Sequence, residues 1–165
     1  MGDSQRAMAV GVFIQASLVR NSRQNDYRIR KMYIPDGYGT VFPYMLVEKA
    51  EALASFLVAA FGASVEGKTV FPDGRVANIR VRIGTSCFMI SEADGQTMTA
   101  MPGTYYVFVE DVDAAFAAAI GNGAREIFEP ADMPYQDRQA GVADPAGNFW
   151  WISKRLVDEP YDKPQ

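Results

Sequence analysis

An internal repeat is the strongest constraint that this sequence places on its fold. When the chain is aligned with itself at an offset of 62 residues, apolar, aromatic and acidic residues recur at matching positions. The matches are Tyr44 with Tyr106, Val47 with Val109, Glu48 with Glu110, and FMIS at 88–91 with WWIS at 150–153. The offset slips by one between these matches, where Gly62 aligns with Gly123. The repeat predicts one structural unit that is used twice.

Each copy of the unit has the same order of sequence patterns. A β-rich segment, TVFPYMLV or TYYVFV, precedes an alanine-rich segment with apolar residues at helical spacing, and Gly62 or Gly123 follows as the expected helix end. Three more β-rich segments come next, and Asp73-Gly74 predicts a hairpin turn between the first two of the first copy. The pattern predicts strand, helix and three strands, over residues 41–91 and again over 104–153.

Composition narrows the classes of partner and compartment. The 165 residues are about one domain's worth of chain, and 16 Lys and Arg against 20 Asp and Glu give a net charge of −4. We therefore expect no nucleic-acid partner, because phosphate binding uses a basic excess. The single cysteine, Cys87, suits a reducing compartment, so we expect a cytoplasmic protein.

The two ends of the chain differ in character from the repeated units. The apolar run AMAVGVFI is far shorter than the roughly 20 residues of a membrane span, so no membrane association is expected. We interpret residues 1–38 as an N-terminal extension and residues 155–165 as a polar tail that contains prolines. Residues 39–154 would then form the domain itself.

The two units resemble the vicinal-oxygen-chelate superfamily, which includes glyoxalase I, extradiol dioxygenases and bleomycin-resistance proteins. They look most like its PhnB-like branch. The segments that carry the resemblance are TVFPYMLVEKAEALASFLVAAFGA, DGRVANIRVRIGTSCFMIS and YQDRQAGVADPAGNFWWIS. The resemblance implies an α+β fold in which two βαβββ modules form an open curled barrel around a central cavity, with the helices outside. It also implies a homodimer.

The same resemblance implies a metal ion held by His, Glu or Gln at four positions. In this sequence those positions fall on Phe42, Met89, Thr104 and Trp151. None of these side chains suits the ion, the chain contains no histidine, and Asn78 stands where the branch often has one. We therefore expect no metal or other cofactor. The alternative is a metal-dependent lyase, isomerase or dioxygenase that uses other ligands, such as Glu92 or Asp144.

Strand alternation then predicts which side chains line the cavity. With Trp151 pointing inward, Phe149 shares its face and Trp150 points toward the helices. The predicted ligand-binding residues are Phe42, Tyr44, Asn78, Arg80, Met89, Thr104, Tyr106, Phe108, Phe149 and Trp151. Such an aromatic lining is typical of a pocket for a flat apolar molecule, and Arg80 could pair with an anionic group of the ligand. Arg82 is expected to be solvated at the edge of the sheet.

Two further features have alternative interpretations. The aromatic residues could instead fill the barrel as an ordinary core, in which case the protein would be a non-catalytic interaction protein. The segment 129–141, EPADMPYQDRQAG, could be a flap over the cavity or a surface connection. Cys87 has no histidine to activate it, so it is expected to be a small buried thiol. The function that fits best is metal-independent binding of a small apolar or aromatic molecule, such as an antibiotic, rather than catalysis.

Overall fold

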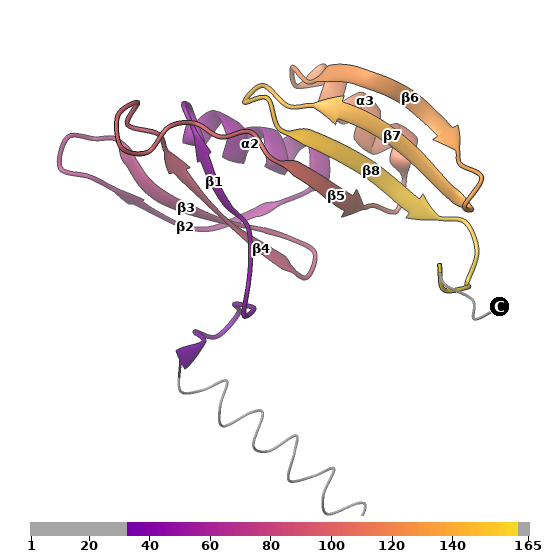
Figure 1. Ribbon diagram of the computed structural model, residues 1–165, viewed down its shortest axis with the longest axis horizontal. Helices are drawn as coiled ribbons and strands as arrows, with labels where there is room; N and C mark the ends of the chain where they lie inside the picture. The colour runs from indigo at the N-terminus through magenta and orange to yellow at the C-terminus, as the bar shows by residue number, and fades with distance from the viewer. Residues whose placement is uncertain (1–32, 162–165) are drawn as a thin grey trace, which may run out of the picture. The chain divides into compact units, whose positions relative to one another are not determined.

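The computed structural model describes residues 33–161, and the chain divides into two units, Met1–Val41 and Phe42–Gln165. Most of the predicted N-terminal extension and the last residues of the predicted tail lie outside the described residues. The second unit contains two consecutive sets of elements (Figure 1). The first module comprises β1 (Tyr44–Val47), α2 (Ala50–Phe61), β2 (Ser64–Val70), β3 (Val76–Ile83) and β4 (Ser86–Glu92). The second comprises β5 (Thr104–Phe108), α3 (Val112–Gly121), β6 (Arg125–Asp132), β7 (Asp137–Ala143) and β8 (Phe149–Arg155).

Each module forms one four-stranded mixed sheet. The strand orders are β1-β4-β3-β2 and β5-β8-β7-β6, with the first and last strands of each module parallel and the other neighbours antiparallel. The register repeats as well, because Tyr44 pairs with Met89 in the first sheet and Tyr106 pairs with Trp151 in the second. The prediction of an α+β fold with two βαβββ modules is therefore confirmed.

The helix ends follow the sequence signals. The α2 helix ends at Gly62, which has a left-handed φ of 64°, and Gly123 after α3 has a φ of 93°. The starts of the two helices differ. Asp111 caps α3 by accepting a hydrogen bond from the Ala114 amide at 3.0 Å, whereas Lys49 makes no side-chain cap at α2. None of the helices formed by residues 33–161 is long and apolar enough to cross a membrane.

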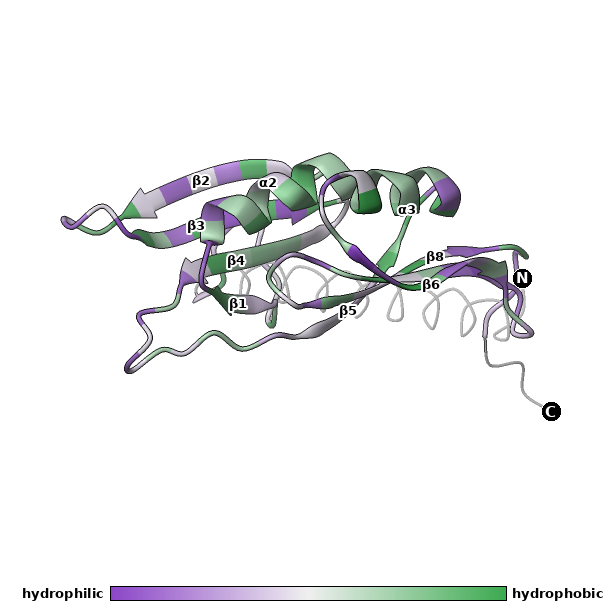
Figure 2. Ribbon diagram, turned by 90° about the horizontal axis from the view of Figure 1, so that it is seen from above, coloured by the Kyte–Doolittle hydropathy of each residue, from purple (hydrophilic) through white to green (hydrophobic). Residues whose placement is uncertain are grey.

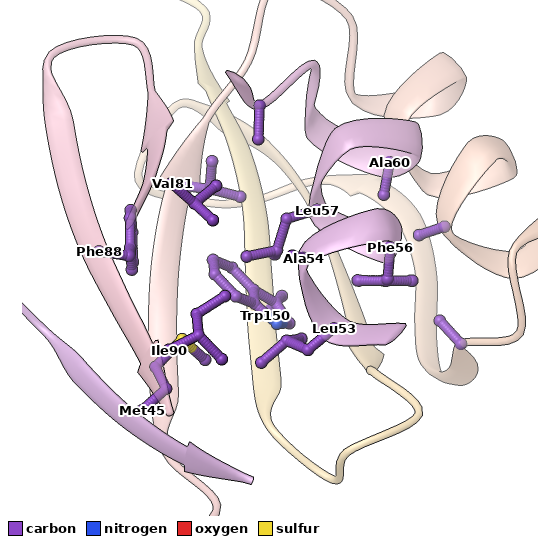
Figure 3. Close-up of a cluster of buried hydrophobic side chains, with 14 of the residues drawn as sticks. Met45, Leu53, Ala54, Phe56, Leu57, Ala60, Val81, Phe88, Ile90 and Trp150 are labelled. Carbon is purple, nitrogen blue, oxygen red and sulfur yellow. The ribbon is translucent and has the colours of Figure 1, made fainter. Parts of the chain in front are cut away.

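Buried apolar side chains of both modules form one core cluster. The helices α2 and α3 lie next to each other (Figure 2). Trp150 of β8 is fully buried and lies among side chains of the first module, between α2 and the strands (Figure 3). Its ring centroid is 5.0 Å from that of Phe61, 4.8 Å from that of Tyr105 and 6.1 Å from that of Phe88. Phe88 and Trp150 are partners in the sequence repeat, so the repeat-related positions meet where the modules join.

The DPAGN turn before β8 holds this junction in place. Asp144 Oδ1 accepts the amides of Ala146 at 2.8 Å and Asn148 at 3.0 Å, and Asp144 Oδ2 accepts Trp150 Nε1 at 2.9 Å. Asn148 Oδ1 in turn accepts the amide of Gly103 at 2.9 Å, which ties the linker between the modules to the turn. The turn therefore has a structural role: it positions the buried tryptophan.

Candidate functional site

Each sheet has one face against the helices and one face turned away from them, which we call its open face. Residues such as Met45, Val81, Trp150 and Ile152 belong to the buried core, so the residues that alternate with them point to the open faces. Trp151 is half-buried on the open face directly beside buried Trp150. The alternation predicted for Trp150 and Trp151 in β8 is thus confirmed.

The open faces contain nine of the ten predicted site residues. The first sheet carries Tyr44, Asn78, Arg80 and Met89, and the second carries Thr104, Tyr106, Phe108, Phe149 and Trp151. Phe42 is half-buried and precedes β1, so it lies outside the sheet. The structure therefore distributes the predicted residues over two surfaces, and their role in ligand binding stays a prediction.

The open face of the second sheet is aromatic and accessible. Tyr106 is 45% exposed, Phe108 is 59% exposed and Phe149 is 40% exposed. The ring centroids of Tyr106 and Phe108 lie 5.1 Å apart, and those of Phe149 and Trp151 lie 6.4 Å apart, nearly edge to face. Together with Phe128 of β6, these residues form what we call the aromatic face. Because they are so exposed, they do not fill a closed barrel within the single chain.

Phe128 was missed by the sequence analysis, and Gly141 explains its position. The Phe128 and Trp151 rings stack at 5.8 Å with 29° between their planes, and Gly141 pairs with both residues. A Cβ on Gly141 would lie 2.6 Å from Phe128 Cε1 and 2.7 Å from Trp151 Cζ3, closer than side chains tolerate. A glycine inside a strand is a signal for such a close approach.

The open face of the first sheet is polar and internally paired. Tyr44 and Ser91 hydroxyls are hydrogen-bonded at 2.6 Å, and Asn78 Nδ2 lies 3.5 Å from Ser91 Oγ. On the neighbouring strands, Glu66 accepts hydrogen bonds from two arginines, Arg80 and Arg82. The hydrogen bond from Arg82 is the main cause that lowers the pKa of Glu66.

This pairing changes the expectation for both arginines. Arg80 Nε lies 3.0 Å from Glu66 Oε2, and its Nη2 donates to the Glu66 carbonyl at 3.3 Å. An anionic ligand group would have to compete with Glu66 for Arg80. Arg82, which was expected to be solvated, instead donates Nη2 to Glu66 Oε2 at 3.1 Å. The sequence could not show this, because Glu66 reaches the arginines only through the pairing of β2 with β3.

A buried carboxylate lies at the polar end of the second open face. Asp137 is 0% exposed, and its Oδ2 lies 2.5 Å from the Tyr161 hydroxyl and 3.1 Å from those of Tyr106 and Ser153. Arg155 Nη1 donates to Oδ1 at 3.0 Å. Burial by itself would raise the pKa of Asp137, but these hydrogen bonds outweigh it and the net pKa is lowered. The sequence analysis did not identify this group.

The side chains that could coordinate a metal ion do not match the metal site that the resemblance implies. Within residues 33–161, no three His, Cys, Asp or Glu side chains are placed to hold a metal ion together. Glu92 lies 3.4 Å from the Val76 amide, and Asp144 is occupied by the turn before β8. Met89 and Trp151 stand at two of the implied ligand positions, and Cys87 is a buried free thiol.

The segment 129–141 forms a hairpin rather than a flap. Its first residues belong to β6 and its last to β7, and only residues 133–136 turn between them. Tyr135 in this turn is 46% exposed and donates to Gln139 Oε1 at 2.8 Å. Arg138 is fixed by Asp113 at 2.6 Å and by Asp132 at 2.9 Å. As a whole the segment is therefore neither a flap nor a surface connection, and only residues 133–136 connect the two strands.

Two cavities bordered by described residues lie away from the open faces. One, of about 380 Å³, lies where α2 begins, and its lining includes Lys49, Leu53, Pro102 and Pro145. The other, of about 350 Å³, lies between α2 and the strands β2 and β3. No predicted site residue lines either of them.

Comparison with known proteins gives a family and a fold. The profile of the Glyoxalase/Bleomycin resistance protein/Dioxygenase superfamily matches residues 40–152. An uncharacterised protein of Mycobacterium bovis is 30% identical over 133 residues, which cover 74% of this chain and 88% of the relative.

Two solved structures show the same fold at low sequence identity. TioX from Micromonospora sp. ML1 superimposes with a TM-score of 0.59 at 20% identity, over 72% of this chain and 100% of that one. A PhnB protein from Bacillus cereus gives a TM-score of 0.58 at 13% identity, over 70% of this chain and 99% of that one.

Proposed function

The chain belongs to the Glyoxalase/Bleomycin resistance protein/Dioxygenase superfamily, and we propose that within it this protein binds a small apolar or aromatic molecule without a metal ion. The observation that carries the proposal is the aromatic face of the second sheet. Tyr106, Phe108 and Phe149 are each at least 40% exposed there, on a sheet whose other face contributes Val142, Trp150 and Ile152 to the buried core. Contiguous exposed apolar patches commonly mark ligand-binding or interaction sites.

The energetics favour a flat ligand on this face. Burial of apolar surface contributes about 25 cal/mol per Å², and a stacked or edge-to-face ring pair adds about 0.5–1.5 kcal/mol. Trp151 is held in place by its stack with Phe128, so a ligand ring that packs on it does not have to order it first. Preorganisation of this kind raises affinity for a given contact area.

The donor set argues against the metal-dependent alternative. A lyase, isomerase or dioxygenase of the family type would need several oxygen or nitrogen ligands that converge on one ion. The chain contains no histidine, and within its described part no trio of His, Cys, Asp or Glu converges. The hydroxyls of Tyr106 and Ser153 have no imidazole to activate them, so binding is favoured over catalysis.

Two finer assignments belong to the same proposal. We place the protein in the PhnB-like branch because DPAGN precedes its last strand and AFGA ends its first helix, and the Bacillus cereus PhnB protein has the same fold. We place it in the cytoplasm because its single cysteine suits a reducing compartment.

We also propose that the protein is a homodimer. Every residue of the edge strand β2 is exposed in the single chain. Natural proteins usually cover such edges, and a second copy that pairs along β2 covers this one. A sedimentation mass of twice 18.2 kDa at micromolar concentration is expected. A mass near 18.2 kDa would contradict the proposed dimer.

The binding proposal is tested by calorimetric titration of the purified protein with 2-methoxynaphthalene, before and after treatment with EDTA. Saturable binding with the same affinity in both samples is expected, together with a metal content well below one ion per chain. Stoichiometric zinc, nickel or iron, lost on chelation together with an enzymatic activity, would overturn the proposal and favour the metal-dependent enzyme.

A further inference from the structure

The open face of the second sheet changes from apolar to polar along β7 and β8. Gly141 pairs with Trp151 in the aromatic part, Gln139 pairs with Ser153 next to it, and Asp137 pairs with Arg155 at the far end. The ring of Tyr106 belongs to the aromatic face, and its hydroxyl accepts Gln139 Nε2 at 2.6 Å and lies 3.1 Å from Asp137 Oδ2. The aromatic face is therefore directly followed by a polar group of residues, Asp137, Ser153 and Arg155, which we call the Asp137 cluster.

A tyrosine from the C-terminal tail occupies this polar end. The hydroxyl of Tyr161 donates to Asp137 Oδ2 at 2.5 Å, and the guanidinium of Arg155 lies 4.3 Å from the centroid of the Tyr161 ring. A phenol thus lies between a buried carboxylate and a cation, beside a row of aromatic side chains. The carboxylate accepts a hydrogen bond from the phenol hydroxyl, and the cation is attracted to the π face of the ring. The site therefore recognises both the hydroxyl and the ring of a phenol.

The described contacts of the tail with this polar end are the Tyr161 contacts and a hydrogen bond from Arg155 Nε to the Glu159 carbonyl at 3.1 Å. Tyr161 is 54% exposed and contributes nothing to the shared apolar core. If it leaves, Asp137 keeps the hydroxyl of Ser153 at 3.1 Å and Arg155 at 3.0 Å. The buried charge is therefore still hydrogen-bonded without the tail, and the site it leaves stays formed.

We propose that Tyr161 occupies a subsite for the hydroxyl-bearing ring of a phenolic ligand, so that the C-terminal tail and the ligand compete for Asp137 and Arg155. The inference rests on the proposed function and gives the ligand a chemical class, a hydroxylated aromatic compound. It also gives the tail a role as an intramolecular competitor. A ring without a hydroxyl binds to the aromatic face and leaves the tail in place.

The test compares Tyr161→Phe with Tyr135→Phe in the full chain. Both changes remove one hydroxyl from a half-exposed tyrosine near this cluster, but the Tyr135 hydroxyl donates to Gln139 and not to Asp137. Each variant is titrated calorimetrically with 2-naphthol and with 2-methoxynaphthalene, which lacks the donor. Tyr161→Phe should bind 2-naphthol about five to ten times more tightly than the wild type, because a competing hydrogen bond to a charged group is lost.

The other three combinations define the control. Neither variant should change the affinity for 2-methoxynaphthalene by more than about twofold, and Tyr135→Phe should not change that for 2-naphthol. Saturating 2-naphthol should also speed chymotrypsin cleavage after Tyr161 in the wild type, as followed by mass spectrometry.

Three results would overturn the inference in distinguishable ways. An unchanged or weaker affinity of Tyr161→Phe for 2-naphthol means that the tail does not compete for this subsite. An equal gain for both compounds means that the tail covers the face without recognising a phenol, and the proposed function then stands. If no variant binds either compound, both the inference and the proposed function fail.

Discussion

The two open faces come from the same structural unit, yet they differ in chemistry. The strand pairings place Met89, Cys87, Arg80 and Arg82 of the first sheet where the second sheet has Trp151, Phe149, Gly141 and Ala143. The first face is therefore covered by arginines paired with Glu66, and the second by aromatic rings. The repeat keeps helix-facing positions apolar, as at Phe88 and Trp150, whereas the open faces differ at these four positions.

Both open faces contain a tyrosine and a serine whose hydroxyls are hydrogen-bonded, but the groups around the two pairs differ. A tyrosine and a serine hydroxyl are hydrogen-bonded in each module: Tyr44 with Ser91 at 2.6 Å and Tyr106 with Ser153 at 2.8 Å. Among residues 33–161, only the second pair is joined to a buried carboxylate, Asp137. The second face thus combines an aromatic surface with a buried carboxylate, and this combination motivates the proposal that it binds the ligand.

The largest effect is expected from Trp150, which belongs to both modules through the core. Trp150→Ala should lower the free energy of unfolding by roughly 3–5 kcal/mol, because a large fully buried side chain leaves a cavity. Urea unfolding followed by circular dichroism measures this, and Trp151→Ala is the control, with a much smaller loss. A single cooperative transition is expected. Loss of one module while the other keeps the wild-type midpoint would show that they do not share a core.

Replacement of Gly141 tests whether the close packing of Phe128 and Trp151 on the second face depends on a glycine between them. Gly141→Ala should cost roughly 1–3 kcal/mol, because the new methyl group collides with Phe128 and Trp151. The matched control is Gly67→Ala on the edge strand of the first sheet, where the nearest heavy atom to a Cβ is Arg80 Nη2 at 3.9 Å. Equal stability losses in the two variants would contradict the close stacking across Gly141.

A smaller effect on stability than in the two predictions above is expected from the carboxylates of the two faces at low pH. The pKa values of Asp137 and Glu66 are both lowered in the folded protein, so each carboxylate stabilises it above about pH 4. That stability is lost as the pH falls through the folded pKa. The Tm of the protein should decrease between pH 6 and pH 3. This decrease should be smaller in Asp137→Asn than in Glu66→Gln, because solvent screens the Glu66 ion pairs and makes them weaker. The opposite order would contradict the assignment of a buried carboxylate to the second face.

The sequence predicted the modules and the direction of most side chains, because both depend on local patterns. The repeat predicted the order of elements along each module, and period two placed Trp150 and Trp151 on opposite faces. The residues that were missed, Glu66, Phe128 and Asp137, act through neighbours on other strands. Those contacts depend on register and turn length, which a one-residue slip would change completely.

The solvent exposure of the aromatic face also could not be predicted from the sequence. Alternation predicts that Tyr106, Phe108 and Phe149 share a face, but not whether another layer covers it. In the described part of the chain these side chains are between 40% and 59% exposed, so the covered alternative does not hold for the single chain. The tail contact of Tyr161 with Asp137 was missed because it depends on how residues after β8 fold back.

The central claim is that the second open face binds aromatic molecules and the first does not. The most direct measurement is the affinity of EDTA-treated Trp151→Ala and Met89→Ala for 2-methoxynaphthalene, since these residues occupy equivalent positions in the two sheets. Trp151→Ala should weaken binding about tenfold, and Met89→Ala by less than about twofold. Equal losses in the two variants, or a loss only in Met89→Ala, would contradict the account.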